Sequence, residues 1–353
     1  RISMNYQVPL DKLPLTDWLN AEYRYEAGYN WRAGPFYSDQ GRRDSLDFGN
    51  TIQNSRDNTL TGKVDLVALY NKVGFLREIN SPSQQARRSS LSNTTQADTV
   101  KQKSENKGLK SIGRLLMMVR SVNATYTLRE GTILPGYTPR AFLFGMDSSF
   151  SSPGLPFLLG SQDPGILQDL ADQGHITNNP NLTQPFVQNQ LQDYNIRANL
   201  EPAKNFTIQL DVRKAKLSNY QELFHASSTD PGEFLSESPN RTGTYAISFM
   251  AIKTAFEGSG DNNESQAFTN FEDYRLEILE RFRERTGVEY DTNSQDVLIP
   301  AFIAAYGGKD PGQVGLSPFP KTPIPNWRVE YTGLTQWKGL SDVFSSISIT
   351  HGY

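Results

Sequence analysis

Histidines are the residues of this chain whose type most readily suggests metal or acid–base chemistry, and there are three of them. His175, His225 and His351 lie far apart in the sequence, and no carboxylate stands at a metal-ligand spacing from any of them. Isolated histidines of this kind are typical of exposed loops and interfaces. We therefore predict that the chain holds no metal ion.

Signatures of other active sites are also missing from the sequence. The Gly-rich stretch EGSGDNNE is not followed by the Lys-Ser/Thr pair and helix of a phosphate-binding loop, and no Gly-x-Ser-x-Gly nucleophile elbow occurs. Carboxylates are numerous, but no pair is marked as catalytic, and RFRER is typical of a solvated helix face. The net charge of -3 gives no electrostatic basis for binding nucleic acid. We predict a protein that is not an enzyme and has neither catalytic residues nor cofactors.

The clearest pattern in the chain is an alternation of apolar and polar residues. In the stretch EYRYEAGYNW, aromatic residues and alanine take one parity, and the charged residues take the other. A period of two predicts a strand with two different faces, and the alternation continues over Leu19–Arg32, beyond the ~5–6 residues of an ordinary strand. A soluble sheet would bury the apolar face in a core. A membrane barrel would turn that face to lipid and the polar face to an aqueous interior.

The same alternation recurs along the chain and predicts about eight or nine strands. It is sharpest in DYNIRANLEPAKNFTIQLDVR, where a tight turn at Pro202-Ala203-Lys204 separates two alternating runs, and it extends, in a more apolar form, to Thr244–Phe256. In the cleanly alternating strands, every charged residue lies on the polar face. The barrel interpretation places one set of residues in the aqueous lumen: Glu22, Arg24, Glu26, Lys63, Asp65, Arg197, Glu201, Gln209, Asp211 and Arg213. It places another set against lipid or at the membrane interface: Tyr23, Tyr25, Tyr29, Trp31, Tyr194, Ile196, Phe206, Ile208 and Leu210.

Composition is compatible with this assignment. Apolar residues make up 37% of the chain, below the usual ~45–50%, while Phe, Trp and Tyr together reach 11%. This combination is typical of a barrel with aromatic girdles and a polar interior, and also of a loop-rich secreted protein. There are no cysteines, and no apolar run approaches the ~20 residues of a membrane helix. Both ends of the chain read as strands cut mid-way, so we expect a segment of a longer protein.

The connections between the expected strands differ greatly in length. Short ones fall at residues 9–17, 202–204 and 335–342. Long ones fall at residues 81–110, a polar stretch that we expect to be mobile, at 130–191 and at 257–325, where spacing predicts helices over about 271–287 and 295–306. Short turns at one end and long loops at the other are typical of outer-membrane barrels. Strict alternation of strand direction does not fit, however. If the turns at residues 202–204 and 335–342 lie at the same end of the sheet, an even number of strands should separate them, and the predicted number is off by one.

Several long strings of the chain point to one family. They are QVPLDKLPLTDWLNAEYRYEAGYNW, LDFGNTIQNS, LYNKVGFL, GTILPGY and NSQDVLIPAFIAAYGGKDPGQVGLSPFPKTPIPNWRVEY. In this order they closely resemble the SprA/Sov family, the outer-membrane translocons of the Bacteroidetes type IX secretion system. The likeness runs from Met4 to Tyr353 and is least distinctive at Ser81–Lys110 and Gly258–Gln266. Family members are several times longer, so residues 1–353 would form part of one barrel domain.

The resemblance implies a single-chain barrel of on the order of 36 strands in the outer membrane of a Gram-negative bacterium. Its pore would pass folded cargo proteins to the cell surface, in a system tied to gliding motility. A PorV-type shuttle protein and a plug protein would occupy in turn a lateral opening in the barrel wall. The resemblance brings no catalytic residue. Asp44-Ser45-Leu46 and Asp98-Thr99-Val100 resemble the O-glycosylation pattern of Bacteroidetes.

The sequence thus predicts an all-β fold, a segment of a very large transmembrane antiparallel β-barrel with long loops and a few short helices. Two alternatives stay open. One is another large outer-membrane barrel, such as a TonB-dependent transporter that passes small solutes. The other is a soluble, secreted β-rich binding module, although a β-sandwich rarely combines such long strands with such long loops. Only the family resemblance separates the translocon from the transporter.

Overall fold

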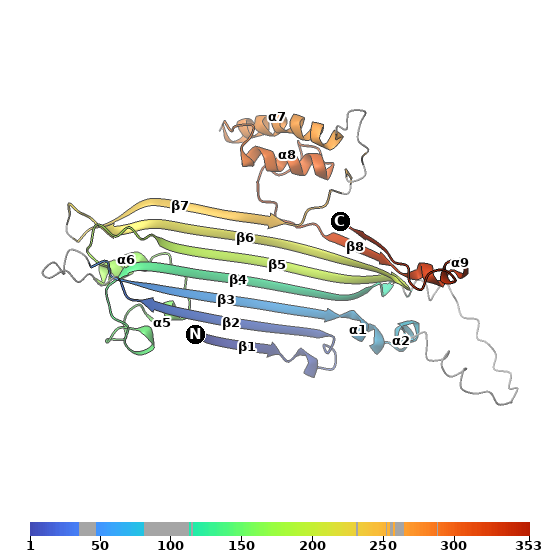
Figure 1. The fold of residues 1–353 in the computed structure, drawn as a ribbon, viewed down its shortest axis with the longest axis horizontal. Helices are drawn as coiled ribbons and strands as arrows, with labels where there is room; N and C mark the ends of the chain where they lie inside the picture. Colours follow the sequence, from blue (N-terminus) through green and yellow to red (C-terminus); the bar gives the residue numbers. More distant parts are fainter. Residues whose placement is uncertain are drawn as a thin grey trace.

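The chain folds around one large antiparallel sheet. The computed structural model describes residues 1–34, 47–80, 113, 116–230, 232–251, 253–254, 257, 265–287 and 289–353. Within these residues, the sheet has nine strands in the order β1-β2-β3-β4-β5-β6-β8-β9, and β7 also pairs with β6 (Figure 1). The strands are β1 Ile2–Val8, β2 Leu19–Arg32, β3 Asn50–Asp65, β4 Val119–Tyr137, β5 Phe186–Ala203, β6 Phe206–Ala226, β7 Phe234–Ile247, β8 Asn326–Tyr331 and β9 Ile349–Gly352. The predicted all-β architecture is confirmed at this level.

The sheet is open. The outermost strands β1 and β9 are not paired with each other, and no pairing among the described residues closes the sheet into a cylinder. Several strands are also much longer than the alternation predicts: β6, for example, has 21 residues and continues to Ala226, far beyond the alternating run that ends at Arg213. Such lengths exceed the ~9–11 residues with which a tilted strand crosses a bilayer.

Strands β7 and β8 are two halves of one interrupted strand. Both pair with the same edge of β6 and run antiparallel to it: β7 pairs with the part from Lys214 to Ala226, and β8 with the part from Phe206 to Asp211. The backbone N–H of Ser248 donates to the Arg213 carbonyl at 2.8 Å, and the N–H of Ile324 donates to the Ser248 carbonyl at 3.0 Å. The chain therefore leaves the sheet and returns to it at neighbouring positions. This interruption explains the count that was off by one, because two predicted strands occupy one place in the sheet.

The predicted strand over Thr244–Phe256 is wrong in its position. The strand found there, β7, begins at Phe234 and ends at Ile247. Its sequence, FLSESPNRTGTYAI, is largely polar on both faces, so its alternation is weak. Pro239 lies inside it, and an edge strand tolerates a proline because one row of its N–H groups needs no partner in the sheet.

The connections do not sort into short and long ends as predicted. At the end of the sheet with the tight turn at Lys204–Asn205, here called the turn end, β3 also ends and β4 begins, so the long connection between these strands starts and finishes there. That connection begins with two helices that the sequence analysis missed, α1 Leu66–Lys72 and α2 Gly74–Asn80. At the opposite end, β2 ends and β3 begins, a short connection joins β6 to β7, and residues 138–185 form a folded segment. The predicted loop over 81–110 lies outside the described residues.

The segment of residues 138–185, here called the cap, is shorter and more ordered than the predicted loop of 130–191. It contains a short 3-10 helix, η2 Leu143–Gly145, and the helices α5 Leu155–Leu158 and α6 Ile166–Asp172. Cap residues Phe157, Leu167, Leu170 and Ile176 form a buried core with side chains of β3, β4, β5 and β6. Figure 1 shows α5 and α6 at the end of the sheet opposite α1, α2 and α9 Lys338–Ser341.

The interruption between β7 and β8 carries a two-helix module. Helix α7 Gln266–Thr286 ends at Gly287, which has a positive φ of 66°, and α8 Gln295–Gly307 follows it, so both predicted helices are confirmed. Helix α8 continues through Pro300. The two helices share a core of Ile278, Phe282, Val297, Ala301 and Ala304, together with Val314. In Figure 1 they lie beyond the β7 edge of the sheet.

None of the helices in the described part of the chain is both long and apolar enough to cross a membrane.

Candidate functional site: the two faces of the sheet

The pairing register places the two predicted residue sets on opposite faces of the sheet. Tyr23 lies opposite Leu60 on β3, Leu60 opposite Tyr126 on β4, and Tyr126 opposite Tyr194 on β5. Arg197 on β5 lies opposite Asp211 on β6. Because side chains alternate along a strand, all residues in register with Tyr23 share one face, here called the apolar face. Those in register with Arg197 share the other, here called the polar face.

Large apolar side chains are exposed mainly on the apolar face. Seven of the eight exposed large apolar residues that lie within strands belong to it, and Leu217 on the polar face is the exception. The seven are Ile2, Met4, Tyr6, Leu60, Tyr194, Ile196 and Ile349. Exposed apolar residues in contiguous rows mark a surface that meets another apolar phase.

The exposed apolar residues form a band that crosses the sheet diagonally. On β1 and β2 the apolar positions extend toward the cap as far as Ile2 and Ala27. In the same register row, the next three strands carry the polar residues Arg56, Glu130 and Gln190, so on these strands the band ends closer to the turn end. At the other side of the sheet the band continues toward the turn end, through Leu210 and Ile208 to Phe206, Tyr331 and Ile349. On β5 the band spans Tyr194 to Leu200, roughly 20 Å at the usual rise per residue. A horizontal apolar layer crosses the register rows diagonally when strands are tilted, as they are by ~35–45° in membrane barrels.

The polar face carries a series of ion pairs between neighbouring strands. Arg197 Nε lies 2.6 Å from Asp211 Oδ1, Arg213 lies 3.3 Å from Asp193, and Arg129 lies 3.3 Å from Asp57. Arg24 lies 3.3 Å from Glu26, which also contacts Arg1. Exposed pairs of this kind contribute only ~0–1 kcal/mol each to stability. Their effect is to leave a hydrated, charge-balanced wall.

Two of the residues predicted to line a lumen lie near the turn end of the sheet. Asp65 is the last residue of β3 and caps helix α1, accepting a hydrogen bond from the N–H of Ala68 at 3.1 Å. Glu201 lies 3.0 Å from Arg120. An acidic residue directly before LVALYNK is a helix N-cap signal that sequence reasoning could have used.

Tyr29 and Trp31 depart from the predicted lipid contact because the cap covers them. Both lie on the apolar face at the cap end of β2, and both pack against the buried core of the cap. The rings of Tyr29 and Phe157 meet edge to face at 6.2 Å between centroids. The sequence pattern could not reveal this, since alternation says nothing of which distant segment folds over a face.

Under the cap, the apolar face becomes polar and forms a buried hydrogen-bond network. Asn54 Nδ2 donates to the carbonyls of Phe157 and Ser161, both at 2.9 Å, and its Oδ1 accepts from Gln162 Nε2 at 3.0 Å. Thr132 Oγ1 donates to Gln162 Oε1 at 2.8 Å. Every one of these bonds joins a strand to the cap, so the network fixes the cap on the sheet.

A charged cluster borders this network. Glu130, whose side chain is 7% exposed, accepts two hydrogen bonds from Arg56, at 2.6 and 3.0 Å, and one from Gln190 Nε2 at 2.7 Å. Gly160 of the cap lies directly over this position: a Cβ on it would approach the Ser55 carbonyl oxygen to 2.8 Å and Arg56 Cβ to 2.7 Å. Its φ of 80° is also one that glycine adopts without strain.

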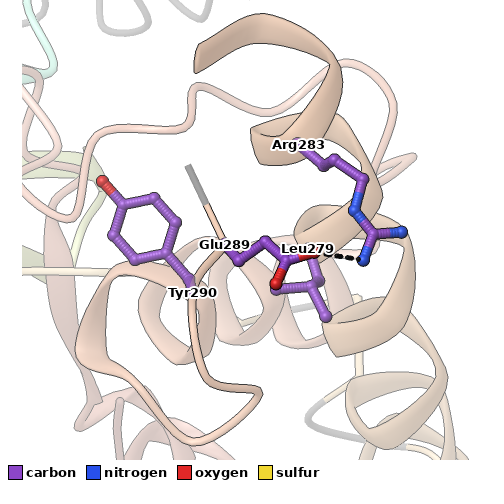
Figure 2. Close-up of a pocket in the computed structure, with 4 residues that line it drawn as sticks. All are labelled: Leu279, Arg283, Glu289 and Tyr290. Carbon is purple, nitrogen blue, oxygen red and sulfur yellow. Dashed lines mark hydrogen bonds and ion pairs between the residues drawn. The ribbon is translucent and has the colours of Figure 1, made fainter. Parts of the chain in front are cut away.

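The module of α7 and α8 has a small surface pocket (Figure 2). Leu279 and Arg283 of α7 and Glu289 and Tyr290 of the following connection line it. The guanidinium of Arg283 lies 3.1 Å from Glu289, and both side chains are largely exposed. The one carboxylate of this lining, Glu289, is exposed and paired with Arg283, and no nucleophile stands beside it, so we assign no reaction to the pocket.

The histidines are separated in space as well as in sequence. His175 belongs to the cap, His225 lies at the end of β6 beside Ala226 and Glu237, and His351 lies on β9 beside Trp327. In the described part of the chain, no group of three or more His, Asp or Glu side chains is arranged to hold a metal ion. Both O-glycosylation patterns, Asp44-Ser45-Leu46 and Asp98-Thr99-Val100, lie outside the described residues.

In comparisons with known proteins, no family model matches the chain, and no curated protein does. The two faces of the sheet are the feature on which a function can be built.

Proposed function

We propose that this sheet is a sector of the wall of a large transmembrane β-barrel in the outer membrane of a Gram-negative, Bacteroidetes-type bacterium. The diagonal apolar band carries the proposal. Its residues would meet lipid, and the ion-paired polar face would meet an aqueous lumen. Seven large apolar side chains left exposed on one face are difficult to reconcile with a sheet surrounded by water on that face.

The open edges of the sheet support a wide barrel. The outer edges of β1 and β9 have no strand partner among the described residues. In lipid each unpaired N–H and C=O costs several kcal/mol, so a membrane wall requires further strands on both sides. We infer that these belong to the same protein. The charged residues of the polar face, including Arg24, Arg197 and Asp211, suit a water-filled interior better than the packed interior of an eight-stranded barrel.

We infer further that the barrel is the protein-conducting channel of a type IX secretion system, exporting folded cargo proteins and linked to gliding motility. This step rests on the resemblance of the sequence to the SprA/Sov family. A charge-balanced face on which Leu217 is the one exposed large apolar side chain among the described strands would let a folded protein pass with little adhesion. A PorV-type shuttle protein, a plug protein and secreted cargo are the partners proposed on the same ground.

Labelling of adjacent residues on β5 tests the membrane orientation. Single cysteines at Ile196 and Arg197, in the full-length protein and a cysteine-free background, would be exposed to a water-soluble maleimide in isolated outer membranes. We expect Arg197→Cys to react and Ile196→Cys to be protected, because lipid excludes the reagent. Reaction at Ile196→Cys with protection at Arg197→Cys would reverse the orientation and refute the barrel proposal. Denatured samples, in which both must react, provide the control.

Conditional depletion of the protein separates the translocon from a solute transporter. We expect cargo proteins to accumulate in the periplasm and the growth requirement for small nutrients to stay unchanged. Loss of uptake of a TonB-dependent nutrient, with secretion intact, would contradict the translocon proposal and favour the transporter.

A further inference from the structure

The cap exposes an unusual number of aromatic and aliphatic side chains. Within residues 142–159, six large apolar residues are exposed, and Phe144, the most open of them, is 79% exposed. The six are Phe142, Leu143, Phe144, Phe150, Leu155 and Leu159. They belong to η2, to α5 and to the turns beside them. Such a cluster marks a contact surface.

This cluster is continuous with the apolar band of the sheet. Tyr25 lies on β2 where the exposed band meets the cap, and its hydroxyl donates to the carbonyl of Leu159 in the cap. Gly145 lies so close to Tyr29 that a Cβ would fall 2.3 Å from its ring. The cluster therefore lies on the apolar face of the sheet, at the boundary between the band and the buried hydrogen-bond network under the cap. Figure 1 shows α5 beside β2, near the start of β1.

Two of the exposed rings are held in a backbone conformation that phenylalanine rarely adopts. Phe144 has a φ of 57° and Phe150 a φ of 59°. In the left-handed region glycine or asparagine is the ordinary choice, and a bulky residue there is strained. Asp147 stabilises the turn that holds Phe150 in this conformation: its carboxylate accepts hydrogen bonds from the N–H groups of Ser151 and Ser152 at 2.8 and 3.0 Å. Two aromatic rings are thus exposed on the cap at positions where the backbone is strained.

We propose that residues 142–159 form an anchor that inserts into the membrane leaflet at the cap end of the barrel. The proposal rests on the barrel function proposed above. Aromatic rings are favoured at the boundary between lipid and water, and the cluster lies where the apolar band places that boundary. A second part of the same polypeptide is the other candidate occupant. The continuity with the band, which is the lipid surface in the proposed function, favours lipid.

Fluorescence quenching by spin-labelled lipids tests the anchor. The environment-sensitive dye NBD would be attached to single cysteines at Phe144, at Ile196 in the band and at Gln173, an exposed polar residue at the C-terminal end of α6, in the full-length protein in nanodiscs. We expect strong quenching at Ile196 by labels deep in the acyl chains, quenching at Phe144 by labels near the headgroups, and little at Gln173.

The outcomes separate the two proposals. Quenching at Ile196 but not at Phe144 would overturn the anchor and leave the barrel intact; a blue-shifted but unquenched dye at Phe144 would show burial in protein. Absence of quenching at Ile196 would refute the barrel itself. Quenching at Gln173 equal to that at Phe144 would show a cap without a defined lipid-facing side, which also overturns the anchor.

A second variant tests the aromatic rings without disturbing the backbone. The double substitution Phe144→Asn and Phe150→Asn keeps residues that tolerate the left-handed conformation and removes both rings. With NBD at Leu155→Cys, we expect headgroup-level quenching to fall at least about twofold, because lost apolar area weakens insertion. Quenching of NBD at Ile196 should stay unchanged. Unchanged quenching at Leu155 would contradict the role of the rings.

Discussion

Replacing Ile196 with arginine is expected to lower the free energy of unfolding in lipid by ~2–4 kcal/mol, the cost of a cationic side chain near the bilayer midplane of a β-barrel. Ile196 lies in the middle of the band on β5, between Tyr194 and Leu200, and is 40% exposed, so the longer side chain meets no packing obstacle. An exposed isoleucine on a soluble sheet would tolerate the same change within about 0.5 kcal/mol. The measurement is urea unfolding of the full-length protein in lipid vesicles, read as the loss of heat-modifiable mobility.

A matched substitution on the opposite face provides the control. Thr125 on β4 lies in register with Asn195 on β5 and Thr61 on β3, on the polar face, and its diagonal neighbours are the exposed Lys63 and Arg197. We expect Thr125→Arg to lower the free energy of unfolding by less than about 1 kcal/mol, since the guanidinium would stay in water, where salt screens its repulsion from these two cations. Equal losses for Ile196→Arg and Thr125→Arg would show that neither face meets lipid selectively.

Removing Arg56 is expected to destabilise the cap by roughly 2–3 kcal/mol. Glu130 would lose two hydrogen bonds at a position where its side chain is 7% exposed. Breaking a buried ion pair costs ~3–5 kcal/mol, and the partial exposure of Arg56 places this pair below that range. Proteolysis of Arg56→Ala in nanodiscs, followed at the cap, should show faster cleavage than in the unmodified protein.

A double-mutant cycle isolates the charge effect. Glu130→Gln alone retains the amide oxygen for Arg56 and should cost less than Arg56→Ala. If the penalty comes from an unpaired carboxylate, Arg56→Ala combined with Glu130→Gln should be less damaging than Arg56→Ala alone. Strictly additive losses would instead mean that Arg56 acts through packing against Gly160. As a reference pair, Arg129 and Asp57 on the polar face should contribute at most about 1 kcal/mol.

The alternation of side chains predicted the two faces because the period of a strand depends on local geometry alone. The helices α7 and α8 were predicted for a similar reason: apolar spacing and a terminal glycine at Gly287 are local signals. The cap-end halves of the long strands were harder to predict. There, residues such as Asn54, Glu130 and Gln190 are polar on the face that the cap covers, so a lipid-facing template does not apply.

The remaining differences come from contacts between distant segments. Tyr29 and Trp31 match the lipid-facing pattern as well as Tyr23 does, and only the fold of residues 138–185 distinguishes them. The common alignment of β7 and β8 on β6 likewise depends on register, which a single sequence does not specify. Asp65 was predicted as a lumen residue, but its role as a helix cap was readable from the residues that follow it.

The interrupted strand has a consequence for how this part of the sheet assembles. Strand β7 can pair with β6 as an ordinary hairpin, through the short connection of residues 227–233. Strand β8 must instead find the remaining rungs of β6 across a long intervening stretch, and closing a long flexible loop costs entropy before any new pair forms. A folded helical module removes that cost, because Phe249 packs on Phe302 and Ile324 returns to Ser248. Prior folding of α7 and α8 therefore favours completion of the β6 rungs from Phe206 to Asp211, because it shortens the flexible loop that β8 must close.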